Sequence, residues 1–230
     1  MKLKLLTLLL AASALTAACS DDDNNTDPSG QARVRVVHAS PDAPAVDVLV
    51  DNAEALSDVS YLTASDYLEL TDGAHNVKVN AAGSSTTVID TDVDLADGTD
   101  YTVIASGLVD AIQPIVLEDD NSTPPAGTAR VRAIHGAPSA PAVDVYVTAP
   151  GADIETASPA LSNVALGDVS DYLEVPEGDY QVRVTGAGTK TVVIDSGALT
   201  LTSGQVRTAI AVDAGGGGAP FDLLVLQDLN

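Results

Sequence analysis

Apolar and polar residues alternate with a period of two along most of the chain after residue 30. Val77 and Val79 flank Lys78, and residues 182–184 repeat the same arrangement around an arginine. Successive side chains of a strand point to opposite faces of a sheet, so this pattern predicts strands with one buried face. Turn signals that contain glycine separate the alternating segments, and no segment keeps the 3.6-residue period of a helix. The pattern predicts an all-β protein.

The chain after residue 30 contains one unit written twice. Residues 32–38 read ARVRVVH, and residues 129–135 read ARVRAIH. The segments APAVDV and DYLE also occur in both units, at residues 43–48 and 140–145 and at residues 66–69 and 171–174. Each unit has space for six to eight short strands in about 100 residues, which is typical of a small sandwich of two sheets. We predict two tandem antiparallel β-sandwich domains, immunoglobulin-like or transthyretin-like.

The repeat and the local composition divide the chain into five segments. The segment between Cys19 and the first unit lacks apolar side chains that would favour ordering, so we expect a disordered acidic tether. Two adjacent prolines between the units favour a short, extended linker. The expected segments are a signal peptide at 1–18, the tether at 19–30, a first sandwich at 31–119, the linker at 120–126 and a second sandwich at 127–230.

The opening of each unit resembles a known bacterial family. Residues 33–48, RVRVVHASPDAPAVDV, are similar to the signature of domain of unknown function 4397. Residues 130–145 carry the same pattern, with Gly136 in place of an alanine and Ser139 in place of an aspartate. The resemblance implies an exported or surface-anchored protein with tandem copies, and it implies no particular activity.

The amino end has the order of an export signal. Lys2 and Lys4 precede an apolar run at residues 5–15, which is too short to span a bilayer. Small residues then lead to Cys19, and this segment resembles the lipobox of bacterial lipoproteins, which implies cleavage before Cys19 and acylation of that residue. We expect a protein anchored by lipid to the outer membrane or cell surface, on its periplasmic or its external face. The alternative is an ordinary secreted protein.

The charge of the chain excludes some partners. Ten Lys and Arg stand against 33 Asp and Glu, which gives a formal net charge of −23. Such a protein repels phosphate backbones, so we expect no nucleic-acid binding. Aromatic residues make up 3% of the chain and tryptophan is absent, so there is little material for stacking against bases or sugar rings. The single cysteine allows no internal disulfide and no cysteine-based zinc site.

Two repeated His and Asp positions are candidates for a structural motif. His38 and His135 end the first strand of each unit, and Asp47 and Asp144 follow in the second strand. One His and one Asp are too few ligands for a metal site. We therefore expect each His to be buried and bonded to carbonyl groups of the Pro-rich loop that follows it.

The arginines of the first strands have a separate expected role. We expect them on the polar face of the strand, paired across strands with carboxylates such as Asp47 and Asp144. These arginines are Arg33, Arg35, Arg130 and Arg132.

The densest acidic cluster is a candidate calcium site. Its members at alternate positions are Asp90, Asp92 and Asp94, and Asp97 follows. Carboxylates spaced in this way bind calcium when the chain curls around the ion, but the required glycine at the sixth position is Leu95. A strand with its acidic face in water explains the cluster equally well.

The sequence contains no complete catalytic motif, so we predict no enzymatic activity. Residues 193–198 resemble the active-site segment of aspartic proteases, but in the first unit Asp92 replaces the glycine of that segment. We predict a non-enzymatic, lipid-anchored envelope protein that acts as a structural, adhesive or protein-interaction module, with an unknown envelope or extracellular protein or polymer as partner. Its contacts would come from loops at residues 40–44, 137–141 and 149–163. The alternative is a calcium- or small-ligand-binding envelope protein that uses Asp90 to Asp100.

Overall fold

The computed structural model describes residues 30–229, which form strands joined by short loops. The first unit comprises β1 (Gln31–Ala39), β2 (Val46–Val50), β3 (Ala53–Val59), β4 (Leu68–Thr71), β5 (Gly73–Ala81), β6 (Thr87–Leu95), β7 (Asp100–Ser106), the 3-10 helix η1 (Val109–Ala111) and β8 (Gln113–Asp119). The second comprises β9 (Thr128–His135), β10 (Val143–Thr148), the 3-10 helix η2 (Ile154–Thr156), β11 (Leu161–Val164), β12 (Leu173–Pro176), β13 (Gly178–Gly186), β14 (Val192–Leu201), β15 (Val206–Val212) and β16 (Asp222–Leu229). Neither short helix, nor any other helix within residues 30–229, is long and apolar enough to cross a membrane.

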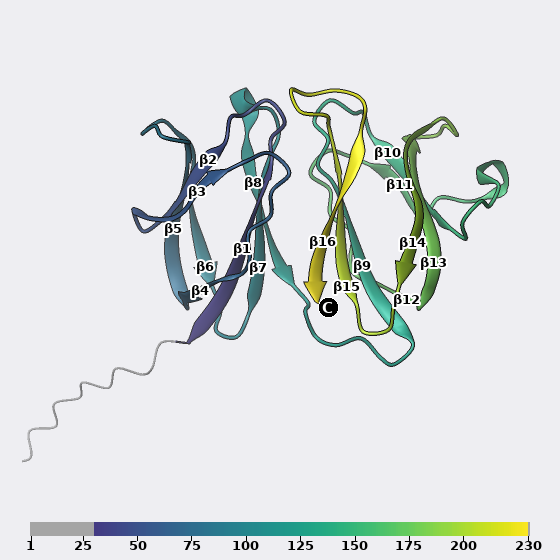
Figure 1. The fold of residues 1–230 in the computed structure, drawn as a ribbon, viewed down its shortest axis with the longest axis horizontal. Coiled ribbons are helices and arrows are strands. Elements are labelled where there is room, and N and C mark those ends of the chain that lie inside the picture. The colour runs from purple at the N-terminus through teal and green to yellow at the C-terminus, as the bar shows by residue number, and fades with distance from the viewer. Residues whose placement is uncertain (1–29, 230) are drawn as a thin grey trace, which may run out of the picture.

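The strands form four sheets of four strands. In the first unit the inner sheet has the order β4-β1-β7-β8 and the outer sheet the order β3-β2-β5-β6. The second unit repeats both orders, as β12-β9-β15-β16 and β11-β10-β13-β14. Figure 1 shows the four sheets as successive layers, with the two inner sheets facing each other at the centre. The predicted all-β class with two tandem sandwiches is therefore confirmed.

The sheets are antiparallel with one exception in each unit. The first strand runs parallel to the seventh, so β1 pairs with β7 and β9 with β15 in parallel register. Parallel neighbours require a long crossover. Five strands supply it, of which four form the outer sheet and the fourth strand of the unit joins the inner sheet. The first strand lies between the fourth and the seventh, whereas in the immunoglobulin order it lies beside the second. The immunoglobulin-like alternative therefore does not describe this order.

Three apolar clusters hold the body together. One fills each sandwich, and the third lies between the two inner sheets. The third cluster includes Val37, Ile104, Ile134, Ile210 and Leu226. Each inner sheet is therefore covered on both faces, and the two sandwiches pack against each other through an apolar cluster of their own.

Charged side chains are also buried between the sandwiches. Arg35 donates from Nη2 to Oδ1 of Asp228 at 2.6 Å, and Arg132 donates from Nη2 to Oδ1 of Asp119 at 2.5 Å. In both pairs the arginine comes from the first strand of one unit and the aspartate from the last strand of the other. The face that the sequence suggested to be polar and solvated is thus the domain interface.

The predicted pairing of the first-strand arginines with Asp47 and Asp144 is wrong. Both aspartates belong to the outer sheets, whereas β1 and β9 belong to the inner sheets. Arg33 pairs instead with Asp100, its register partner on the neighbouring strand β7. Arg130 pairs with the first residue of the linker. The sheet assignment, which the sequence pattern does not contain, decides these partners.

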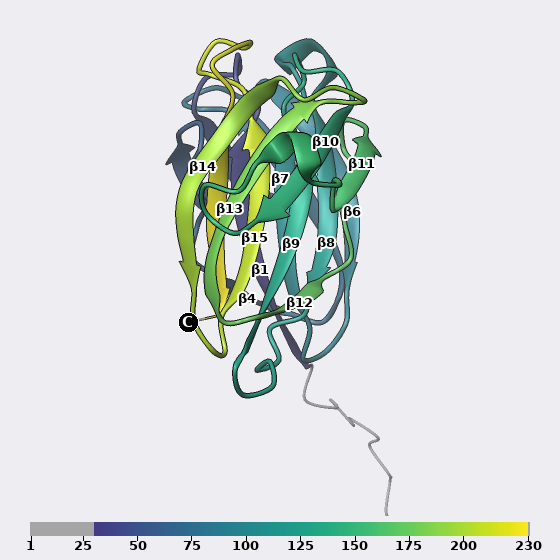
Figure 2. The same cartoon turned by 90° about the vertical axis from the view of Figure 1, so that its right-hand side faces the viewer.

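The chain enters the body at one end, and the loops that follow the first strand of each sandwich lie at the other. Strand β1 starts at Gln31 at one end and reaches Ala39 at the other, and Figures 1 and 2 show this same direction for β9. The predicted signal peptide, Cys19 and the tether up to residue 29 lie outside the described residues. The chain therefore enters the body at the end opposite to the loops that follow β1 and β9.

Candidate functional site

The loops at the end of the body opposite to Gln31 form one composite surface, which we call the tip (Figure 1). Figure 2 shows loops of both sandwiches at this same end. The tip comprises residues 40–45, 60–62 and 107–112 of the first sandwich and residues 136–142, 165–167 and 213–221 of the second. Two of the three loops predicted to contact a ligand, 40–44 and 137–141, thus come together.

The signature histidines fix the Pro-rich loops of the tip. His38 Nε2 lies 3.0 Å from the carbonyl oxygen of Pro44, and the backbone N–H of Ser40 donates to Nδ1 at 3.3 Å. His135 makes the equivalent contact with Pro141 at 3.1 Å. In each ring Nδ1 accepts a backbone N–H, so Nε2 is the nitrogen that donates to the proline carbonyl. Burial lowers the pKa of His38. The loop carbonyls are the partners that the sequence analysis expected.

A Gly-rich loop at residues 213–221 joins the two Pro-rich loops. The N–H of Gly216 donates to the carbonyl oxygen of Pro41 at 2.7 Å, and the N–H of Gly218 donates to Ser139 Oγ at 3.1 Å. Both glycines have positive φ angles, 92° and 82°, which favour glycine over other residues. This loop was not among the predicted contact loops, although its run of four glycines is a recognisable signal.

A second contact holds the tip together across the domain boundary. Tyr61 of the first sandwich donates to the carbonyl oxygen of Asp213 in the second at 2.7 Å. The buried Asp213 carboxylate accepts bonds from the N–H groups of Ser139 at 3.2 Å and Gly218 at 2.9 Å. Burial, with the nearby Asp213 charge, raises the pKa of Tyr61 to about 12. The loops of the tip are therefore fixed relative to one another.

The tip exposes apolar side chains. Leu62, Leu108 and Leu166 are 37%, 39% and 46% exposed, and each lies in a different loop of the tip. Asp42 supports one of these loops, because its Oδ1 accepts the N–H of Val109 at 2.8 Å. Exposed apolar residues gathered on one surface are typical of interaction sites.

The signature aspartates accept hydrogen bonds from backbone N–H groups and do not pair with the first-strand arginines. Each accepts one backbone N–H bond from a positive-φ residue of the neighbouring edge strand and one from a glycine in a turn. The donors, at 2.8 to 2.9 Å, are Asp58 and Gly83 for Asp47 and Asn163 and Gly188 for Asp144. These two bonds lower the pKa of Asp47. The repeated Asp is therefore a turn clamp at the same place in both sandwiches.

The acidic cluster lies along β6, at the edge of the first outer sheet. Asn76 Nδ2 donates to Asp90 and Asp92 at 2.9 Å each, and Asp97 accepts the N–H of Gln31 at 2.9 Å. Asp94 is exposed. Within residues 30–229, no group of three or more His, Cys, Asp or Glu side chains is arranged to hold a metal ion.

The long insertion of the second unit lies away from the tip. Figure 1 shows residues 149–163, with η2, on the outer side of the second sandwich. Lys190 Nζ anchors it by donating to the carbonyl oxygens of Ile154 at 2.8 Å and Ala157 at 2.6 Å. Arg183 adds a bond to the carbonyl oxygen of Ala152 at 2.8 Å. This third predicted contact loop therefore does not join the other two.

The segment that resembles an aspartic protease lies on β14. Asp195 is exposed there, and its Oδ1 accepts bonds from Gln181 at 2.7 Å and from the N–H of Gly197 at 2.9 Å. These bonds lower the pKa of Asp195. The equivalent Asp90 belongs to β6, in the outermost layer on the opposite side of the body. The two aspartates therefore do not form a pair that shares a proton.

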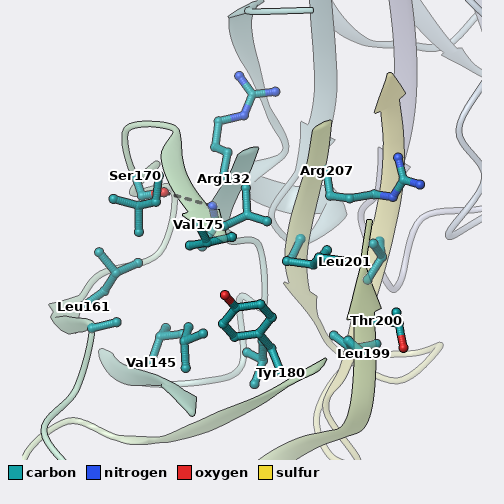
Figure 3. Close-up of a pocket in the computed structure, with 18 residues that line it drawn as sticks. Arg132, Val145, Leu161, Ser170, Val175, Tyr180, Leu199, Thr200, Leu201 and Arg207 are labelled. Carbon is teal, nitrogen blue, oxygen red and sulfur yellow. Dashed lines mark hydrogen bonds between the residues drawn. The ribbon is translucent and has the colours of Figure 1, made fainter. Parts of the chain in front are cut away.

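The second sandwich contains an apolar cavity between its two sheets (Figure 3). The cavity has a volume of about 210 Å³, whereas the matching space in the first sandwich has about 20 Å³. Its lining includes Val131, Val145, Leu161, Leu199 and Leu201. No Asp or Glu side chain lines it. The sequence pattern alone did not predict this difference between the two copies.

Comparison with solved structures gives weak similarities. An α-glucan-binding streptococcal virulence factor is 11% identical with a TM-score of 0.25, covering 77% of this chain and 91% of that chain. A family CBM26 module of Eubacterium rectale Amy13K in complex with maltoheptaose is 9% identical with a TM-score of 0.24, covering 86% and 96%. A leucine-rich repeat protein of Bacteroides thetaiotaomicron is 12% identical with a TM-score of 0.19, covering 83% and 27%. TM-scores of this size assign neither a ligand nor a function.

A family model matches most of the chain. No curated protein matches the chain at a significant level. The family described as "Domain of unknown function (DUF4397)" matches residues 4–48, 32–146 and 147–230. These segments together cover most of the chain, and the segment 32–146 contains the signature of the first copy and that of the second. The chain belongs to the DUF4397 family.

Proposed function

We propose that the protein is a non-enzymatic, lipid-anchored protein of the cell envelope that acts as an adhesive or protein-interaction module. The anchor would be Cys19, and the contact surface would be the tip. The observation that carries this proposal is the position of the tip at the end of the body opposite to Gln31, where the tether would join. A contact surface so placed is the part of the body farthest from the membrane.

The construction of the tip supports this role. Loops on a rigid scaffold are where binding residues are usually found, because the scaffold holds them without further ordering. The Gly216–Pro41 and Tyr61–Asp213 bonds fix loops of both sandwiches together, so little conformational entropy would be lost on binding. The exposed leucines supply apolar area for a protein partner.

The test uses photo-crosslinking on intact cells. The position of Leu108, in the tip, is replaced by a photoreactive amino acid in one variant, and the position of Val116, in the middle of β8, in another. Both side chains are similarly exposed, at 39% and 41%, so they form a matched pair. We expect a discrete crosslinked species from the Leu108 position and none from the Val116 position. Equal crosslinking at both positions, or none at either, contradicts the proposal.

A second measurement tests the anchor independently. Protease added to intact cells should cleave the wild-type protein, and the Cys19→Ala variant should appear in the culture medium. Protection from protease until the outer layer is broken would place the body in the periplasm and would exclude adhesion to other cells. Retention of the Cys19→Ala variant at the membrane would contradict lipid anchoring.

A further inference from the structure

The cavity of the second sandwich arises from two substitutions that face each other. Val36 on β1 and Val103 on β7 are register partners in the first sandwich, and both are buried. The partners at the same positions of the second sandwich are Ala133 and Ala209, which both line the cavity. Each alanine lacks two methyl groups that the valine supplies, so their shared space stays open.

A third difference changes the chemistry at the margin of the cavity. Tyr101 fills the first sandwich as the register partner of Val34, and Arg207 takes this position in the second sandwich. Arg207 donates from Nη1 to the carbonyl oxygens of Val206 at 3.0 Å and Leu229 at 2.9 Å. Figure 3 shows its guanidinium directed away from the apolar side chains. The arginine stem therefore lines the cavity while its charged end lies at the rim.

The outer sheet also leaves the cavity more open. In the first sandwich Val93 and Leu95 are buried, whereas Leu199 and Leu201, in the same positions of β14, are only partly buried. The register of β13 and β14 shifts beside Gly197, which has a φ of 62°. Such a bulge bends its strand locally. The bend accompanies the larger cavity of the second sandwich.

The hydrogen-bond donors around the cavity indicate which charge a bound ligand would carry. Tyr180 and Ser170 bond to backbone carbonyls, and Arg132 is held in the domain interface. Within residues 30–229, Nε and Nη2 of Arg207 make no hydrogen bond and no carboxylate lies within ion-pair distance of the group. In a chain of net charge −23, an arginine of this kind beside an apolar cavity favours an anion.

We propose that the cavity of the second sandwich binds one unbranched alkyl chain that carries a single anionic head group, as in a free fatty acid. The chain would lie between the sheets, and Arg207 would bind the head group at the rim. An apolar cavity of about 150 Å³ holds a molecule the size of benzene, so the larger volume of about 210 Å³ accepts part of an alkyl chain. This site is separate from the tip, and the proposal does not depend on the proposed function.

The test measures binding of decanoate to the full chain by calorimetry. Wild-type protein should bind one decanoate, and it should bind decyltrimethylammonium, which has the same chain and the opposite charge, about tenfold more weakly. The Ala133→Val/Ala209→Val variant, which restores the residues of the first sandwich, should lose decanoate binding by about tenfold or more. Unchanged binding in that variant overturns the proposal, as does the absence of binding to the wild type.

Two control variants separate the cavity from general effects. The Val36→Ala/Val103→Ala variant makes the reciprocal change in the first sandwich, where Tyr101 stands in place of Arg207. It should leave the decanoate affinity of the second sandwich and its preference for decanoate over decyltrimethylammonium unchanged. Arg207→Met should remove most of the preference for decanoate over decyltrimethylammonium, and Arg207→Lys should restore part of it. If the doubly refilled variant does not fold, Ala209→Val alone and Arg207→Met provide the same test. Equal affinity for both probes in the wild type contradicts the role of Arg207.

Discussion

Arg35 in the first strand and Asp228 in the last strand form a buried ion pair of 2.6 Å across the two sandwiches, although 193 residues separate them along the chain. Their side chains are 4% and 0% exposed. Arg132 and Asp119 form the reciprocal pair. The two sandwiches are thus joined by an arrangement that repeats as the sequence repeats, with each copy supplying one cation and one anion.

Tyrosines of the repeated DYLE segment complete this arrangement. The ring of Tyr67 lies 4.9 Å from the guanidinium carbon of Arg35, and the ring of Tyr172 lies 4.5 Å from that of Arg132. Tyr67 also donates to Asp119 at 2.7 Å. Burial raises the pKa of Tyr172 to about 12 and raises the pKa of Tyr67 further. Both phenol hydroxyl groups therefore keep their protons near neutral pH. The network therefore combines ion pairs, hydrogen bonds and cation–π contacts in one buried layer.

Arg35→Met should strongly destabilise the protein. The change leaves Asp228 buried without its cation, which typically costs about 3–5 kcal/mol of the free energy of unfolding. Arg33→Met is the control, because Arg33 is half-exposed and solvent screens its pair with Asp100, so we expect a smaller loss than for Arg35→Met. Urea denaturation of both variants measures the difference. Equal losses in the two variants would show that the interface pair has no special weight.

Removing both charges should recover much of that loss. Arg35→Met combined with Asp228→Leu replaces the buried pair by apolar side chains, which is often neutral or stabilising. We expect the double variant to be more stable than Arg35→Met alone in the same urea experiment. A double variant that is less stable than the single variant would mean that Asp228 is held by other groups, such as Thr208.

Asp144→Ala should destabilise the second sandwich through its turns. The buried carboxylate accepts the N–H groups of Asn163 and Gly188, and leaving such groups without partners costs about 1–3 kcal/mol. Asp195→Ala is the control, since Asp195 is exposed on β14. Thermal or urea unfolding checks the order of the two variants. A larger loss for Asp195→Ala would contradict the clamp.

His75 and His38 should titrate in opposite directions from the ordinary value of 6.5. A hydrogen bond between Nδ1 of His75 and Asp51, at 2.7 Å, raises the pKa of His75, whereas burial lowers that of His38. Titration of the ring resonances by NMR should give midpoints above 6.5 for His75 and below 6.5 for His38. Midpoints in the reverse order would contradict both environments.

The two shifts have opposite effects on stability. The contribution of His75 is fully present below its unfolded pKa of about 6.5 and is lost as pH rises through its higher folded pKa. His38 is neutral in the fold, so stability is lost as pH falls below about 6.5, where the unfolded chain takes up a proton. The stability difference between wild type and His75→Gln should therefore shrink as pH rises.

The melting temperature should rise with NaCl. A net charge of −23 causes repulsion among surface carboxylates, and the Debye length falls from about 10 Å at 0.1 M salt to about 3 Å at 1 M. The buried pairs of the interface are screened much less, so they should not offset this gain. Thermal melts in increasing NaCl measure the effect. A melting temperature that stays flat up to molar salt would contradict the prediction.

Local patterns were enough to predict the strands, the repeat and the roles of the signature histidines. Val77 and Val79 alternate with polar residues because one face of their sheet is exposed to solvent. His38 contacts the carbonyl oxygen of Pro44 because only a short loop separates the two residues. The same pattern predicts the polar face of Arg35 but not its partner, because it does not show what covers that face. The inner sheets are covered on both sides, and a period of two cannot distinguish water from a second domain.

The sequence by itself determined the all-β class, the duplication and the family signature, since these depend on residues close together in the chain. The tertiary structure alone decided which faces meet. Asp228 forms an ion pair with Arg35, and Gly216 donates a hydrogen bond to Pro41. Ala133 and Ala209 are register partners on neighbouring strands. In each case the two residues are far apart in sequence. Such contacts depend on sheet order and domain packing, which are global outcomes of burying apolar area, and no local spacing encodes them.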